Sequence, residues 1–212
     1  MTLNEIYVLN RAIDGAEIYA LPKLNIPLSD FLISSVKDKL VEKRILNTHK
    51  SFTDEGIRLT QRIRLYKTAV KYISINRITI GLQDENNGVA LIYNPYFNSY
   101  AFDKIFSEDI FSCLTETYPF LQEDGEAVSE HEQEESIAFD LLKERHHIDH
   151  KKSLIVKTKS KDVETHEELY FANNQFYLYD HIRQILIQKS KEKLIDIIRE
   201  RMKIHGQDIS SS

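Results

Sequence analysis

Residues 28–66 read LSDFLISSVKDKLVEKRILNTHKSFTDEGIRLTQRIRLY, and they carry the clearest structural signal in the chain. The pattern predicts an amphipathic helix that stops at Arg44-Ile45-Leu46, an irregular step, and a second helix opened by the FTDEG segment. This order of elements is typical of a winged-helix-like unit. Such units read DNA in some proteins and form the N-terminal part of a protein-binding domain in others.

Residue spacing and capping side chains predict these two helices. Ser29 and Asp30 can satisfy unpaired N–H groups at the start of the first helix, and Thr53 or Asp54 can cap the second. Gly56 lies in the first turn of the second helix, where a glycine costs less than in a helix interior. The residues expected to face inward are Leu28, Phe31, Leu32, Val36 and Leu40, and then Ile57, Leu59, Ile63, Tyr66 and Val70.

The rest of the first half is predicted to be a helix, then strands, then another helix. A helix capped by Thr2 covers residues 3–13, and a helix from Ser107 to Tyr118 stops at Pro119. β-Branched and aromatic residues predict extended segments between them, at Tyr72–Leu82, Val89–Tyr93 and Tyr96–Phe102, with Asp84–Gly88 as a turn.

A similar pattern returns in the second half. A helix is predicted over residues 135–146, with Ile137, Leu141 and Leu142 as its apolar stripe. Helical periodicity is also predicted over residues 180–204, with a bend near Ser190, and with Ile185, Leu194, Ile197, Ile198 and Met202 on the apolar side. The strands expected in between are Ser153–Lys159, Glu167–Ala172 and Gln175–Tyr179, with a turn at Asn173-Asn174.

The two halves resemble each other in plan. In each, an aromatic-rich hairpin (ALIYNPYFNSYAF, then ELYFANNQFYLYD) leads into helical sequence. A degenerate internal duplication and the ordinary likeness of α+β segments both explain this, and both stay open.

These elements predict an α+β fold: a central antiparallel β-sheet flanked by helices, with a winged-helix-like N-terminal unit and a C-terminal helical part. We expect one domain over residues 1–205, whose halves, about 1–121 and 135–205, are joined by an acidic loop at 122–134. Residues 122–136 contain seven acids and no Lys or Arg, which is typical of a mobile segment. Residues 206–212 are expected to be a disordered tail.

Composition points to a cytoplasmic protein without membrane insertion. No apolar run approaches the roughly 18–20 residues that a membrane helix needs, and the N-terminus lacks the features of a signal peptide. The single cysteine, Cys113, excludes an internal disulfide and is interpreted as a small buried hydrophobe.

No residue pattern indicates a catalytic, cofactor or metal site. His146 and His150 are one helical turn apart, with His147 between them and His131 upstream, but flanking Lys and Arg residues oppose a cation. We therefore interpret the cluster as solvated residues at a helix end. Glycine-rich phosphate loops and GxSxG elbows are absent from the sequence, so no catalytic residue and no cofactor is predicted.

A DNA-binding regulator of the winged-helix type is the alternative function. The net charge of −5 opposes nucleic-acid binding. Asp38 and Glu42 interrupt the basic face of the helix that precedes Arg44, which weakens attraction to phosphates. That face also offers no Asn or Gln to read adenine, so we expect no nucleic-acid partner.

The chain resembles the EspG-like cytosolic chaperones of type VII secretion systems, in particular the Firmicutes branch that serves toxin substrates. The resemblance covers most of residues 1–205. It is carried by LNEIYVLNRAI with Leu21-Pro22, by LVEKRIL continuing through FTDEG, by KYISINRITIGL with NGVALIYNP, and by the repeated strand–helix plan that ends in a long basic helix. The acidic segment at 122–135 departs from that pattern.

The resemblance implies a central antiparallel sheet with helices on its flanks and a quasi-twofold relation between the halves. It also implies a protein that is not an enzyme, and that binds helical-hairpin secretion substrates or toxins and keeps them soluble. Whether the protein forms a homodimer stays open. For the partner-binding surface we predict the turn Asp84, Glu85, Asn86, Asn87 and Gly88, and the C-terminal helix through Ile195, Arg199 and Met202.

Overall fold

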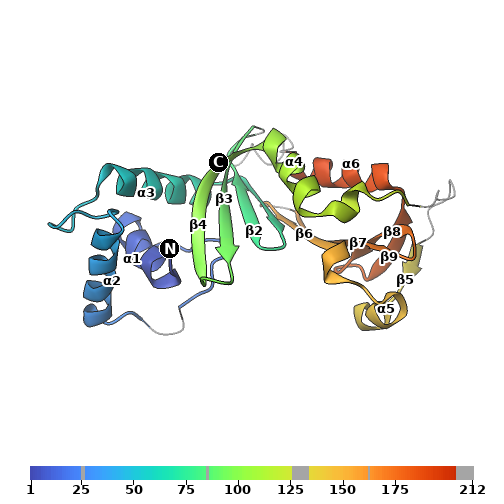
Figure 1. The fold of residues 1–212 in the computed structure, drawn as a ribbon, viewed down its shortest axis with the longest axis horizontal. Coiled ribbons are helices and arrows are strands. Elements are labelled where there is room, and N and C mark those ends of the chain that lie inside the picture. Colours follow the sequence, from blue (N-terminus) through green and yellow to red (C-terminus); the bar gives the residue numbers. More distant parts are fainter. Residues whose placement is uncertain (25–26, 85, 126–133, 162, 204–212) are drawn as a thin grey trace.

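The computed structural model describes residues 1–24, 27–84, 86–125, 134–161 and 163–203. Within these ranges the chain forms six α-helices and one nine-stranded antiparallel sheet, which confirms the predicted α+β fold. The molecule is elongated. Its sheet runs from a group of three helices at one end to the helices α5 (Phe139–His146) and α6 (Lys191–Met202) at the other (Figure 1).

Three capped helices form the N-terminal end. They are α1 (Leu3–Ile13), α2 (Asp30–Glu42) and α3 (Asp54–Lys67). Thr2, Ser29 and Thr53 each accept a hydrogen bond from a backbone N–H in the first turn of the helix that follows, as their sequence positions predicted. After α2 the chain reverses through Arg44, whose φ of 58° lies in the left-handed region.

The sheet follows the order β4-β3-β2-β1-β6-β7-β8-β9-β5, and every neighbouring pair is antiparallel. The strands are β1 (Lys71–Ile75), β2 (Ile78–Leu82), β3 (Asn87–Asn94), β4 (Ser99–Phe106), β5 (Glu134–Ser136), β6 (Ser153–Lys159), β7 (Glu164–Ala172), β8 (Gln175–Asp180) and β9 (Ile185–Lys189). Three further helices complete the fold: α4 (Ser107–Thr117), α5 (Phe139–His146) and α6 (Lys191–Met202).

The repeated plan seen in the sequence is present in the connectivity. In each half a helix leads into a meander of four antiparallel strands, and a second helix follows: α3, β1–β4 and α4 in the first half, and α5, β6–β9 and α6 in the second. The two meanders join where β1 pairs with β6, so a single sheet passes through both halves.

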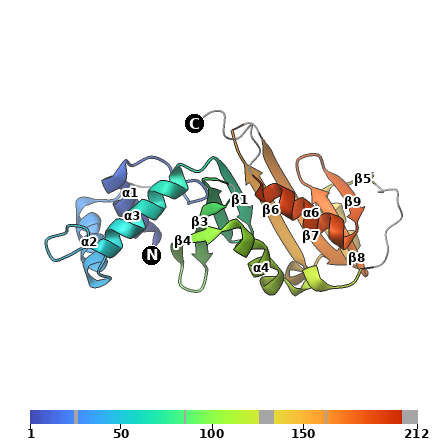
Figure 2. The same ribbon diagram turned by 90° about the horizontal axis from the view of Figure 1, so that it is seen from above.

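The two faces of the sheet are covered differently. Helices α4 and α6 pack on one face along both halves, as Figure 2 shows, and form the largest core with residues such as Ile73, Leu154 and Leu169. Side chains that alternate with these point to the other face. There α1–α3 cover the first half, around Tyr66 and Phe102, and α5 covers the second half.

Several predicted strand boundaries are wrong in the first half. Tyr72–Leu82 is not one extended segment but the hairpin β1–β2, which turns at Asn76-Arg77, where Asn76 has a φ of 50°. The strand predicted from Tyr96 begins at Ser99 instead, because Asn94 caps a turn by accepting backbone N–H bonds from Tyr96 and Phe97.

The second half contains two strands where helix was predicted. Residues 185–189 form β9, and the helix begins only after the N-cap Ser190. Likewise Glu134–Ser136 form β5, and α5 begins at Phe139 rather than near residue 135. Residues 126–133 of the predicted acidic loop and the predicted tail at 206–212 lie outside the described residues.

Four residues expected in the core are exposed. Phe31 is 84% exposed, Leu141 59% and Ile57 45%, although each fits the helical period of its segment. Cys113, interpreted as buried, is exposed on α4. Periodicity identifies an apolar stripe, but the neighbouring elements decide how wide a stripe is covered.

Candidate functional site

The turn between β2 and β3 is held by one side chain. Asp84 Oδ1 accepts hydrogen bonds from the backbone N–H groups of Asn86 and Asn87, each at 2.8 Å, and the Asn87 amide donates to the same carboxylate. These bonds stabilise the charged carboxylate and lower the pKa of Asp84. Asp84, Asn86 and Asn87 therefore present a hydrogen-bonded, exposed polar surface.

The predicted turn, Asp84–Gly88, extends too far at its C-terminal end. Asn87 already belongs to β3, and Gly88 is buried in that strand opposite Leu82. A Cβ at Gly88 would lie 3.1 Å from side-chain atoms of both Ile80 and Leu82. Gly88 is therefore needed for close packing, and Glu85 lies outside the described residues.

The predicted residues of α6 divide between the core and the surface. Met202 is 7% exposed and packs in the largest core with Leu194 and Ile198, so its side chain is not presented to solvent. Ile195 is only partly buried, and Arg199 is exposed, 3.5 Å from Asp196. Of these three residues, Ile195 and Arg199 can contact a partner.

The fold brings the turn and the end of α6 to the same end of the sheet. Lys71 at the start of β1 pairs with Leu82, and Leu82 pairs with Gly88 beside the turn. The Lys71 ammonium also donates a hydrogen bond to the backbone carbonyl of Lys203, directly after α6. Two segments more than 100 residues apart in the sequence therefore border one region of the surface.

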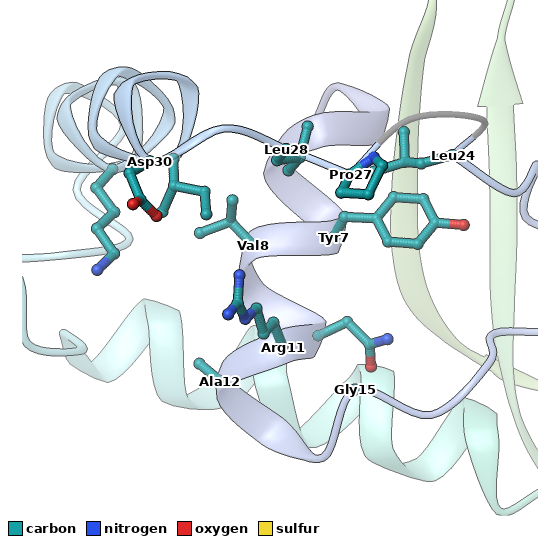
Figure 3. A pocket seen from close by; sticks show the side chains of 12 residues that line it. Tyr7, Val8, Arg11, Ala12, Gly15, Leu24, Pro27, Leu28 and Asp30 are labelled. Atoms are coloured by element: carbon teal, nitrogen blue, oxygen red, sulfur yellow. The ribbon is translucent and has the colours of Figure 1, made fainter.

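A groove of about 590 Å³ lies between α1, α2 and the segment that joins them (Figure 3). Its lining is mostly apolar, and Arg11, Asp30 and Lys37 add charges. The hydroxyl of Tyr7 donates to the carbonyl of Pro22 at 2.7 Å, which ties the joining segment to α1. No pattern in the sequence indicates this groove, because three separate segments form it. The lining residues are Tyr7, Val8, Asn10, Arg11, Ala12, Gly15, Leu24, Pro27, Leu28, Asp30, Ile33 and Lys37.

The histidines of the sequence cluster do not share one environment. The His146 ring lies 4.9 Å from Tyr177 and 5.8 Å from Tyr170, and burial lowers its pKa, whereas His147 is exposed. Across the described ranges, no group of three or more His, Cys, Asp or Glu side chains has an arrangement that could hold a metal ion.

A second histidine pair, which the sequence analysis did not single out, lies under α5. The rings of His166 and His181 stack with centroids 4.1 Å apart, and His181 Nε2 is 3.3 Å from Glu168 Oε2. Burial, together with the charges of His181 and Lys157, lowers the pKa of His166 to about 4. Burial and Lys157 also lower the pKa of His181. The folded protein therefore favours neutral rings at this position.

Acidification is expected to destabilise the fold between about pH 6.5 and 4. The unfolded chain protonates a histidine near pH 6.5, whereas folded His166 stays neutral until about pH 4. The unfolded state thus binds more protons in this window, and the free energy of unfolding decreases as the pH is lowered. The loss should be about 2 kcal/mol for His166 after discounting for its partial exposure.

Urea unfolding measured at several pH values tests this expectation. His166→Gln should flatten the dependence on pH, and His49→Gln, at an exposed loop position, should leave it unchanged. If the free energy of unfolding changed equally with pH in the wild type and in His166→Gln, the loss of stability could not be assigned to His166.

Nearly all of the chain matches a protein family. A family model described as "Domain of unknown function (DUF5081)" matches residues 1–208. The chain belongs to this family. The match includes every element from α1 to α6, so both halves of the sheet lie within one family unit. A comparison with curated proteins found no match. No helix among the described residues is long and apolar enough to cross a membrane.

Proposed function

We propose that this protein is a cytosolic chaperone or adaptor that binds a type VII secretion substrate, a toxin or its small helical partner, and keeps it soluble before export. The observation that carries the proposal is the region shared by the Asp84 turn and α6. It combines a fixed polar turn with a helix that leaves the apolar side chain of Ile195 partly exposed. The resemblance in sequence pattern and the repeated α+β plan also support it.

Such a surface suits a cargo that must be released again. A helical hairpin that awaits export exposes apolar side chains, and these aggregate unless another surface covers them. A contact made by one helix and one turn buries a moderate area, as transient complexes do, which suits transfer to the export machinery. Arg199 adds a cation beside Ile195 on the same helix.

Co-expression with a helical-hairpin type VII substrate from the same organism tests the proposal. The substrate should be largely insoluble when expressed alone. Together with this protein it should become soluble and elute with it as one complex in size-exclusion chromatography. A substrate that is equally soluble alone and elutes separately would argue against the chaperone function.

In the same assay, Ile195→Asp tests whether the substrate contacts α6. The substitution should weaken substrate binding about 10-fold, the effect of losing about 1.4 kcal/mol at a central contact. The fold should persist because Ile195 is partly exposed. Lys193→Asp, at an exposed position on the same helix, is the matched control and should bind normally. Unfolding of Ile195→Asp, or unchanged binding by it, would exclude this surface.

A further inference from the structure

A second concave surface lies where the two halves of the sheet meet. On the face covered by α1–α3 and by α5, these two helical layers leave a groove of about 580 Å³ over the central strands. We call it the central groove. It is lined by Tyr19, Ala20, Pro22, Ser74, Asn76, Arg77, Thr79, Leu91, Tyr93, Tyr100, Ile155 and Lys157.

The central groove is positively charged although the chain has a net charge of −5. Arg77 and Lys157 are its only charged lining residues, and no acid lies among them. Both are exposed, and neither has an ion-pair partner within the described part of the chain. Lys157 lies opposite Ser74 in β1 and opposite His166 in β7. Its charge lowers the pKa of His166 and His181.

Most of the other polar groups in the groove are already engaged. The hydroxyls of Ser74 and Thr79 are hydrogen-bonded to each other at 2.9 Å. The Asn76 side chain donates to the Tyr118 hydroxyl and accepts from the backbone N–H of Ile155. Arg77 and Lys157 therefore remain as the cationic donors available to an incoming group, and carboxylates match them.

Aromatic rings form the wall of the groove and extend beyond it. Tyr93 and Tyr100 pack with ring centroids 4.9 Å apart, next to the turn between β3 and β4. At that turn Tyr96 is 92% exposed and Phe97 79% exposed, and Figure 2 shows the β3–β4 hairpin projecting past the rest of the sheet. Adjacent exposed aromatic residues offer rigid apolar contact area, which is typical of protein interfaces.

We infer that the central groove binds an acidic amphipathic segment of a polypeptide partner. Its carboxylates would meet Arg77 and Lys157, and its apolar side chains would pack against Tyr96 and Phe97. This site is separate from the α6 surface, and it rests on the proposed function only in taking the ligand to be part of a protein.

Fluorescence anisotropy with two labelled peptides tests the inference on the full-length protein. One is an amphipathic peptide of Glu and Leu, and the other has the same pattern with Lys in place of Glu. The Glu–Leu peptide should bind and the Lys–Leu peptide should not. Binding should weaken as salt is raised, because charge pairs at an exposed site are screened.

Matched variants locate the binding. Arg77→Gln with Lys157→Gln should weaken the Glu–Leu peptide 10-fold or more. Lys104→Gln with Lys151→Gln, two exposed lysines outside the lining, should change affinity less than 2-fold. Tyr96→Ser with Phe97→Ser should also weaken binding 10-fold, and this effect should persist at high salt because it removes apolar contacts.

Three outcomes would overturn the inference: no binding of the Glu–Leu peptide, equal losses in the groove and control variants, or tighter binding of a single-stranded oligonucleotide that depends on Arg77 and Lys157. The last would assign the groove to nucleic acid. None of these results depends on the secretion substrate, so the co-expression assay can succeed or fail independently.

Discussion

Arg201→Ala is expected to destabilise the protein by about 3 kcal/mol. Arg201 on α6 forms a two-pronged ion pair with Glu167 on β7, with Nε–Oε2 at 2.9 Å and Nη2–Oε1 at 2.6 Å. The Glu167 side chain is only 4% exposed, so removing the guanidinium leaves a buried carboxylate without its cation. That penalty is much larger than the loss of an exposed ion pair.

Urea unfolding gives the free energy directly, and two comparisons make the result specific. Arg199→Ala removes an exposed arginine from the same helix and should cost less than about 0.5 kcal/mol. Replacing both residues, with Glu167→Leu and Arg201→Met, should recover most of the loss, since two apolar side chains leave neither a buried charge nor an unpaired polar group. Equal losses for Arg201→Ala and Arg199→Ala would show that Glu167 is not buried as described.

Gly56→Ala is expected to destabilise the protein by about 2–3 kcal/mol. Alanine is the better helix former by about 1 kcal/mol, so helix propensity alone predicts the opposite sign. In the fold, a Cβ at this position would overlap the carbonyl oxygen of Ile45 and lie 3.1 Å from the Phe52 ring. That carbonyl accepts hydrogen bonds from the backbone N–H and the hydroxyl of Thr53, so moving it disrupts the cap of α3.

Thermal or urea unfolding of Gly56→Ala measures this effect. Gln61→Ala, at an exposed site of the same helix, is the control and should change stability by no more than about 0.5 kcal/mol. A Gly56→Ala protein as stable as the wild type would mean that the loop from Ile45 to Phe52 can move away from α3 at little cost.

Local chemistry made most helix starts predictable. Thr2, Ser29 and Thr53 cap the helices that follow them, because a short polar side chain reaches N–H groups within its own turn. The turn at Asn173-Asn174, where both residues have positive φ, was predictable for the same local reason, but the turn at Asn76 was missed. The strand at residues 185–189 was not predictable from the sequence. Its short run ILIQK fits a strand or a helix equally well, and only pairing with β8 decides between them.

The candidate surfaces depended on contacts that a linear pattern does not contain. Arg77 and Lys157 are 80 positions apart and line one groove only because β1 pairs with β6. The exposure of Cys113 likewise follows from which elements cover α4.

The sequence by itself determined the type and order of most elements, since capping, turn chemistry and side-chain period act over a few residues. The tertiary structure alone decided which apolar stripes are buried, which charges stay unpaired and which distant segments share a surface. Those outcomes come from packing between elements far apart in the chain, where burial of apolar area outweighs local propensity.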